Sequence, residues 1–441
     1  MGKESTRRAF LTTMGVTGVV SLAGCSSLPG GGGGNKPADP SGTDNGTATT
    51  TATTTTSGGS SGGSGGNNAP GQSVVDFSSV KDWQPAAGKL STTTKDVFQG
   101  NQSVALEPKG GENVAKITKT FFSDSGGENA LDLTKHDLSL AAKIKKPNLK
   151  LQDTRMRIAV NVIAPAESAM VTAIRQFPRE LDGWVRFDLG YTDKTGNPKL
   201  GNVTKIEIQV GPRQDGKKFK VLVDDLRKVP KGNKGKVMLQ FDDGFYTTYE
   251  NAFPMLKERG WPGSVAVIPN AVNSEEYVTS QQMREMSKAG WDIVGHYGQP
   301  LSTMKAEQQK QALQQVQQYL KIQGFKQGAK HFVLPNHRLN NAALKNIDEL
   351  FETAYLQGGC PNNAKYPSNP SFISRINGES IRGSRRIIDM AAEFNQLAVL
   401  YFHEIGDGDG WLPKADFKKL LDYIEKKNVD VITPTQLTKN K

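Results

Sequence analysis

The sequence contains little cysteine, and beyond residue 30 it has no apolar segment long enough to span a bilayer. Its two cysteines are Cys25 and Cys360. Cys25 belongs to a separate N-terminal motif, so Cys360 stands alone and a disulfide framework is excluded. We expect Cys360 to be a buried free thiol rather than a nucleophile. The hydrophobic fraction of 36% is also below the usual range, and much of that deficit lies in one polar segment near the N-terminus.

The charge balance is basic but has no recognisable pattern. Lysine and arginine number 55 against 44 acids, a net charge of +11, and they form no long block and no ladder interleaved with aromatic residues. A scattered excess of this kind predicts a solvated surface. We find no nucleic-acid motif and expect no nucleic-acid partner. Attraction to an anionic glycan or an anionic membrane stays open.

Residues 1–25 have the composition of a targeting segment. Arg7 and Arg8 precede a modest apolar run that ends in Leu22–Cys25 (Leu-Ala-Gly-Cys). A basic start, an apolar stretch and small residues at the end are typical of a signal peptide. The arginine pair resembles a twin-arginine export signal, and the last four residues resemble a lipobox in which Cys25 is lipidated. We expect a lipid anchor at the extracellular face of the cell membrane; an ordinary export signal or an N-terminal membrane anchor are the alternatives.

Residues 26–73 are nearly all Gly, Ser, Thr, Asn, Pro and Asp. A segment of this composition cannot bury an apolar core. It predicts a disordered, flexible linker between the anchor and the folded part of the protein.

Residues 74–232 show short runs in which apolar and polar residues alternate, such as Met156–Val162 and Lys205–Val210. This period of two, between turn residues, predicts an antiparallel β-sandwich. The segment resembles jelly-roll carbohydrate-binding modules. Trp83 and Trp184 are candidates for stacking on sugar rings, although the pattern favours core or half-buried positions for both.

From residue 233 to the end at residue 441, predicted strands alternate with predicted helices. Strands are expected at Val237–Phe241, Asp292–Gly295 and Leu397–His403, among others. Repeated strand–helix alternation predicts parallel strands, here closed as an irregular (β/α) barrel. Active residues in such barrels lie at the C-terminal ends of the strands.

Four residues occupy these strand ends: Asp242, Asp243, His296 and His403. Their shared position predicts that they form one site. Within the adjacent acids, one carboxylate can hold a metal while the other accepts a proton from water. An acidic turn closed by Gly244 is the alternative, because Asp and Gly favour turns for local reasons.

The segment Phe241–Gly244 (Phe-Asp-Asp-Gly), the stretch ending in Gly295–His296 and the segment Tyr401–Ile405 are similar to the polysaccharide deacetylases, the NodB-homology family of carbohydrate esterases. The resemblance implies a hydrolase acting on carbon–nitrogen bonds other than peptides, with a divalent metal, usually zinc. It implies further that Asp242 is the general base, that Asp243 and His296 are metal ligands, and that His403 is the general acid.

Two motifs depart from the family pattern. The second motif usually has two histidines separated by three residues and followed by proline, whereas here Gln299 stands before Pro300. A glutamine oxygen suits zinc poorly, so the third ligand is either Gln299 or His337. The third motif, at Phe332–Arg338, offers no counterpart of the arginine that orients the base in the family.

The sequence thus predicts an exported, lipid-anchored enzyme that removes acetyl groups from an N- or O-acetylated polysaccharide or cell-envelope glycan by metal-assisted attack of water. The alternative is a catalytically weakened or inactive glycan-binding surface lipoprotein, which Gln299 and the altered third motif favour. A cell-envelope protein that contacts other proteins is a third possibility.

Overall fold

The computed structural model describes residues 70–439, apart from 122–129, 147–155, 179 and 213–217. The predicted export segment, the lipidation site Cys25 and nearly all of the linker at 26–73 lie outside the described residues. What is described belongs to one compact unit. Within these residues no helix has the length and apolar character needed to cross a membrane.

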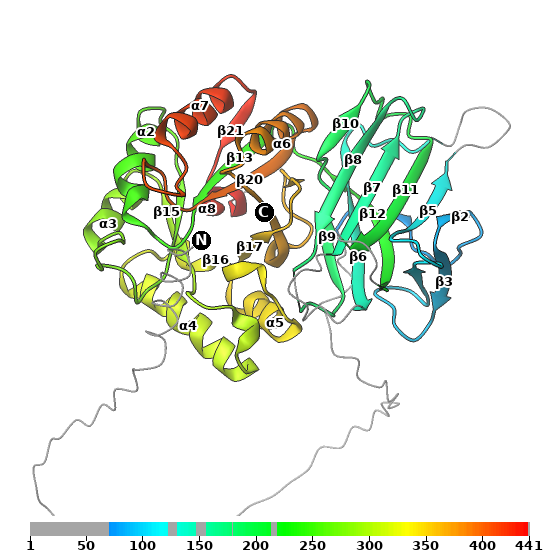
Figure 1. The fold of residues 1–441 in the computed structure, drawn as a ribbon, viewed down its shortest axis with the longest axis horizontal. Helices are drawn as coiled ribbons and strands as arrows, with labels where there is room; N and C mark the ends of the chain where they lie inside the picture. Colours follow the sequence, from blue (N-terminus) through cyan, green and yellow to red (C-terminus); the bar gives the residue numbers. More distant parts are fainter. Residues whose placement is uncertain (1–69, 122–129, 147–155, 179, 213–217, 440–441) are drawn as a thin grey trace, which may run out of the picture. The chain divides into compact units, whose positions relative to one another are not determined.

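Two antiparallel sheets of six strands each form the first part (Figure 1). One sheet has the order β3 (Lys89–Thr93), β4 (Ser103–Glu107), β12 (Lys220–Pro230), β6 (His136–Lys146) and β9 (Val185–Asp188), with β1 (Gln72–Val75) also pairing with β12. The other has the order β10 (Asp193–Thr195), β8 (Met170–Gln176), β7 (Met156–Ile163), β11 (Lys205–Pro212), β5 (Ala115–Thr120) and β2 (Trp83–Ala87).

The predicted alternation accounts for the packing of these sheets. On β7, Ile158, Val160 and Val162 are buried, and the residues between them are partly exposed. Their apolar faces join those of β4, β6 and β11 in one core cluster, so the two sheets enclose a shared core. We refer to this pair of sheets as the sandwich; its jelly-roll topology and any sugar binding stay predictions. Trp83 lies in this core and stacks on Phe77.

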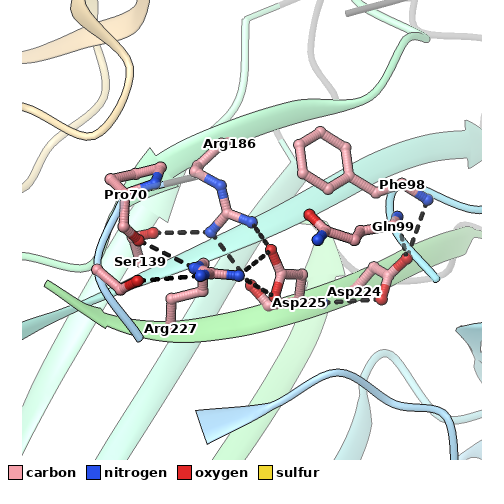
Figure 2. A network of polar contacts seen from close by, with 9 residues as sticks. Pro70, Phe98, Gln99, Ser139, Arg186, Asp224, Asp225 and Arg227 are labelled. Atoms are coloured by element: carbon pink, nitrogen blue, oxygen red, sulfur yellow. Dashed lines mark hydrogen bonds and ion pairs between the residues drawn. The ribbon is translucent and has the colours of Figure 1, made fainter. Parts of the chain in front are cut away.

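A buried polar network lies within the sandwich (Figure 2). Asp225 bonds the guanidinium of Arg186, which also donates to Ser139 Oγ at 2.8 Å. Arg227 donates to both Asp225 oxygens, at 3.1 and 3.3 Å, and to the Pro70 carbonyl at 2.9 Å. One carboxylate therefore neutralises two guanidinium groups, and Arg227 ties the start of the described chain to β12.

The second part is a barrel of seven parallel strands (Figure 1), and the sequence predicts all of them except the strand at Ile373–Asn377. Its strands are β13 (Gly235–Phe241), β14 (Ser264–Val267), β15 (Asp292–Gly295), β16 (His331–Val333), β17 (Thr353–Gln357), β19 (Ile373–Asn377) and β20 (Gln396–Phe402), and β20 closes the ring on β13. Two further strands join it, β18 (Asn362–Asn363) on β20 and β21 (Val429–Val431) on β13. The helices that follow the strands are α2 (Phe253–Lys257), α3 (Ser280–Lys288), α4 (Ala306–Ile322), α5 (Asn341–Leu350), α6 (Ile381–Phe394), α7 (Lys414–Glu425) and α8 (Pro434–Thr438).

The pleat of the barrel strands decides which side chains face inward. On β13, Val237, Leu239 and Phe241 pack with helix residues in an outer cluster. Met238 packs instead with residues of other strands, such as Val294 and Val399, in an inner cluster. Because successive side chains alternate, the inward positions continue to residue 242 on β13, 296 after β15 and 403 after β20. The pleat thus sets three of the four predicted site residues on the inner side.

Substitution of Asp225 by alanine is expected to lower the free energy of unfolding by about 3–5 kcal/mol, because Arg186 would stay buried without its carboxylate. Urea unfolding of the full-length protein measures this change. The control is Asp82→Ala, which removes a carboxylate from an exposed pair with Lys119 and should leave unfolding unchanged. Equal effects of the two variants would contradict the role given to the network.

Candidate active site at the C-terminal end of the barrel

Asp242 follows β13 and is buried beside Arg375 of β19. The two Nη atoms of Arg375 donate to the two Asp242 oxygens, at 2.7 and 3.0 Å. The Arg375 guanidinium also lies over the ring of Tyr401 on β20, 4.6 Å from its centroid. A bidentate pair of this kind fixes the plane of the carboxylate as well as its position.

Asp243 would point away from the barrel interior if the strand continued. Its backbone instead has φ of 65°, in the left-handed region that residues other than glycine rarely adopt. The turn brings Asp243 Oδ1 to 3.3 Å from His296 Nε2. His296 Nδ1 bonds the carbonyl of Val333 at 2.7 Å, so the ring orientation is set by the backbone. Local strain in the backbone therefore places the second acid in the same site as the first.

His403 follows β20 and pairs with Glu379, which lies after β19. Nδ1 of His403 is 2.8 Å from Glu379 Oε1, and the same oxygen accepts the backbone N–H of His403 at 3.2 Å. The His403 side chain is 44% exposed, which leaves it accessible to a bound molecule.

The charges of the site shift the pKa of both histidines upward. Burial lowers the pKa of His403, but the hydrogen bond to Glu379 and the carboxylates of Asp242 and Asp243 outweigh it and raise that pKa to about 9. Burial likewise lowers the pKa of His296, and Asp243 reverses the effect, so the net direction is upward. For Asp243, burial raises the pKa, while the bond to His296 and the nearby positive charges bring it below its ordinary value. His403 is consequently protonated at neutral pH.

The fit of a divalent metal depends on the number of ligands. Asp243 and His296 provide a carboxylate and an imidazole close together, and the bond from Nδ1 to a backbone carbonyl is the contact that usually orients a metal-binding histidine. A catalytic zinc site has three protein ligands. Within the described part of the chain, no cluster of three or more His, Cys, Asp or Glu residues could hold an ion. The donors thus fit a weakly held ion and do not complete a zinc site.

The two predicted third ligands lie in different places. Gln299 is half-buried in the bend after β15. His337 lies in a short turn where its own φ is 50°, and its Nε2 is 3.2 Å from the carbonyl of Phe177 in the sandwich. The structure therefore directs His337 toward the sandwich rather than toward Asp243 and His296.

Sequence reasoning missed two residues of the site, Arg375 and Glu379. The expected place for an arginine was the segment after β16, whereas Arg375 comes from β19, a strand that the sequence reading did not identify. The pattern that could have revealed it is the short run Phe372–Asn377 between Pro370 and Gly378. In that run Ile373 and Arg375 share the inner face.

Replacing Glu379 with glutamine removes the charge that stabilises the imidazolium form of His403. We expect the pKa of His403 to fall from about 9 toward its ordinary value of 6.5. NMR titration of the histidine ring protons measures this, with His403→Gln used to assign the resonance. Glu349→Gln, at a surface pair with Lys310, is the matched control. An unchanged titration in the Glu379→Gln variant would contradict the pairing.

Binding of zinc, cobalt or nickel should be weak and should depend on His296. Isothermal titration calorimetry is expected to show weak binding to the unaltered protein and no binding to the His296→Ala variant. Dialysis against a chelator is expected to remove the bound ion. The control His136→Gln changes a histidine of the sandwich and should bind as the unaltered protein does. An ion that survives the chelator would show that a third ligand completes the site.

Comparison with known families places the barrel among described proteins. Residues 230–351 match the family model described as polysaccharide deacetylase. The chain is 33% identical over 60 residues to YxkH of Bacillus subtilis (strain 168), a protein assigned to the polysaccharide deacetylases. That alignment covers 14% of this chain, and the chain spans about a fifth, 22%, of the length of YxkH. The similarity to this family therefore covers slightly more than the first half of the barrel, up to residue 351.

Two solved structures are also similar to the chain, at low identity. The Xyl-CE4 domain of a multidomain xylanase from the hindgut metagenome of Trinervitermes trinervoides is 20% identical, with 47% of this chain and 91% of that chain covered and a TM-score of 0.35. A family 4 acetyl xylan esterase from Clostridium thermocellum is 16% identical, with 46% and 90% covered and a TM-score of 0.34. Because these scores are low, the description of the fold depends on the strand pairings.

Proposed function

We propose that the barrel, being similar to the polysaccharide deacetylases over residues 230–351, hydrolyses acetyl groups on an N- or O-acetylated glycan. The observation that carries the proposal is the pair of opposed groups at the barrel end. Asp242 pairs with Arg375, and the pair with Glu379 raises the pKa of His403. A base and an acid beside one another are what hydrolysis by water requires.

Asp242 is the general base of the proposed reaction. An amide carbonyl is a poor electrophile, so the attacking water must lose its proton as the bond to carbon forms. The fork of Arg375 holds the Asp242 carboxylate in one orientation, and the ring of Tyr401 in turn supports Arg375. The base therefore needs no reorganisation when the water approaches.

His403 is the general acid. Because Nδ1 faces Glu379, Nε2 is the nitrogen that can give a proton to the departing amine or alcohol of the sugar. Asp243 and His296 would hold a divalent ion beside these groups. When bound, such an ion would polarise the acetyl carbonyl and lower the pKa of water.

The location and partner of the enzyme are proposed from the N-terminal sequence. The arginine pair and the lipobox-like Leu22–Cys25 favour export and a lipid anchor on Cys25, at the extracellular face of the cell membrane. Acetylated polysaccharides of the cell envelope or the surroundings are the substrates that an anchored enzyme of this type can reach. The incomplete ligand set favours one alternative, a surface protein that binds glycans and hydrolyses them slowly or not at all.

Replacing Asp242 with asparagine should reduce acetate release from acetylated oligosaccharides by about 100-fold or more, because the base is lost. Enzymatic assay of released acetate measures this, and thermal unfolding checks that the variant still folds. Asp430→Asn, on the exposed strand β21, is the control and should keep full activity. Equal acetate release by the Asp242→Asn variant would refute the mechanism; glycan binding without any release would favour the binding protein.

A further inference from the structure

Arg175 on β8 of the sandwich is fully buried, and its guanidinium is directed at the barrel. Nη2 donates to the carbonyl of Phe372 at 2.9 Å, and the guanidinium lies 4.7 Å from the Phe372 ring centroid. Its Nε has no hydrogen-bond partner among the described residues. A buried cation is costly, and here its strongest contact is a backbone carbonyl three residues before Arg375.

The next residue of β8 makes a second connection to Arg375. The backbone N–H of Gln176 donates to the carbonyl of Gly358 at 2.8 Å. The N–H groups of Gly358 and Gly359 both donate to the carbonyl of Arg375, at 3.1 Å each. One residue of the barrel, Gly358, therefore links the end of β8 to the backbone of Arg375.

The packing at this point leaves no free space. A Cβ atom built on Gly358 would lie 2.5 Å from Ser374 Oγ and 2.7 Å from Arg175 Nη1. Real Cβ atoms do not approach other atoms so closely. Arg175, Gly358 and Ser374 thus hold one another in place, and a shift of one must move the others.

The rest of the connection from β17 to β19 is anchored on the sandwich as well. Asp188, which is buried, accepts the N–H groups of Asn363 and Ser368, both at 3.1 Å. Asp137 accepts the side-chain amide of Asn363 at 3.0 Å. The strand that carries Arg375 is consequently entered through a segment that is hydrogen-bonded to two buried carboxylates of the sandwich.

From these contacts we propose that the sandwich helps to position the catalytic site and that Arg175 is a positioning residue for Arg375. The inference rests on the proposed function of the barrel, since it assigns Arg175 to the same reaction. Arg175 fixes the start of β19, β19 fixes Arg375, and Arg375 fixes the carboxylate of Asp242. A displacement of about 1 Å in such a chain of contacts is enough to cost about 100-fold in rate.

The test uses Arg175→Met in the full-length protein, because methionine keeps an unbranched apolar stem without the charge or the donors. We expect kcat for acetate release to fall at least tenfold while KM stays the same, since Arg175 does not contact the substrate. Amide hydrogen exchange should become faster at residues 372–377. Arg175→Lys, which keeps one donor for the Phe372 carbonyl, should recover part of the kcat.

The control is Asn341→Ala, which removes a different contact between sandwich and barrel. Asn341 accepts the N–H of Gly183 at 2.8 Å and donates to Asp182 at 2.7 Å, on the side of α5. It should leave kcat and the exchange of residues 372–377 unchanged. If Arg175→Met does not fold, Gly358→Ala replaces it, and the same loss of kcat is expected.

Wild-type kcat and exchange in the Arg175→Met variant would overturn the inference. So would an equal loss of kcat in the Asn341→Ala control, because that result indicates general weakening of the protein. If the unaltered protein releases no acetate, the proposed function fails. The inference about Arg175 is then decided by amide hydrogen exchange at residues 372–377 alone. Faster exchange confined to that segment then supports the coupling, and unchanged exchange refutes it.

Discussion

The buried pair of Asp242 and Arg375 is the interaction on which the site depends. Both side chains are almost completely removed from solvent, and the two hydrogen bonds between them satisfy one charge with the other. Burying two ions costs several kcal/mol each, so a pair of this kind is stable only when its geometry is good. Removal of either partner alone would leave an uncompensated buried charge. The position of Arg375 is therefore a requirement of both folding and the proposed chemistry.

The barrel supplies this geometry through the period of its strands. Inward positions on β13, β19 and β20 bring Asp242, Arg375 and Tyr401 together at one end, because parallel strands present their C-terminal ends at the same edge. Asp243 is the exception, since its left-handed backbone turns the side chain back toward His296. The adjacent acids thus reach one site by two different means, the pleat for the first and a strained turn for the second.

The sequence predicts the barrel well because its strands carry strong local patterns. The predicted strand Asp292–Gly295 coincides with β15, and the predicted strand ends correctly locate Asp242, His296 and His403. Arg375 and Glu379 were missed because their strand is short and follows a long connection whose shape is set by contacts with the sandwich. Those contacts join residues more than 170 positions apart, and no local pattern encodes them. Likewise, nothing in the sequence shows that the turn at His337 directs its ring toward Phe177.

In the proposed mechanism both parts of the chain complete the site, and the decisive question is whether a covalent bond is broken. Mass spectrometry of an acetylated oligosaccharide incubated with the full-length protein in water labelled with ¹⁸O answers it most directly. The account predicts that the sugar loses the mass of its acetyl groups and that the released acetate carries one ¹⁸O atom. An oligosaccharide that binds the protein but keeps its full mass would contradict the account and identify a glycan-binding protein instead.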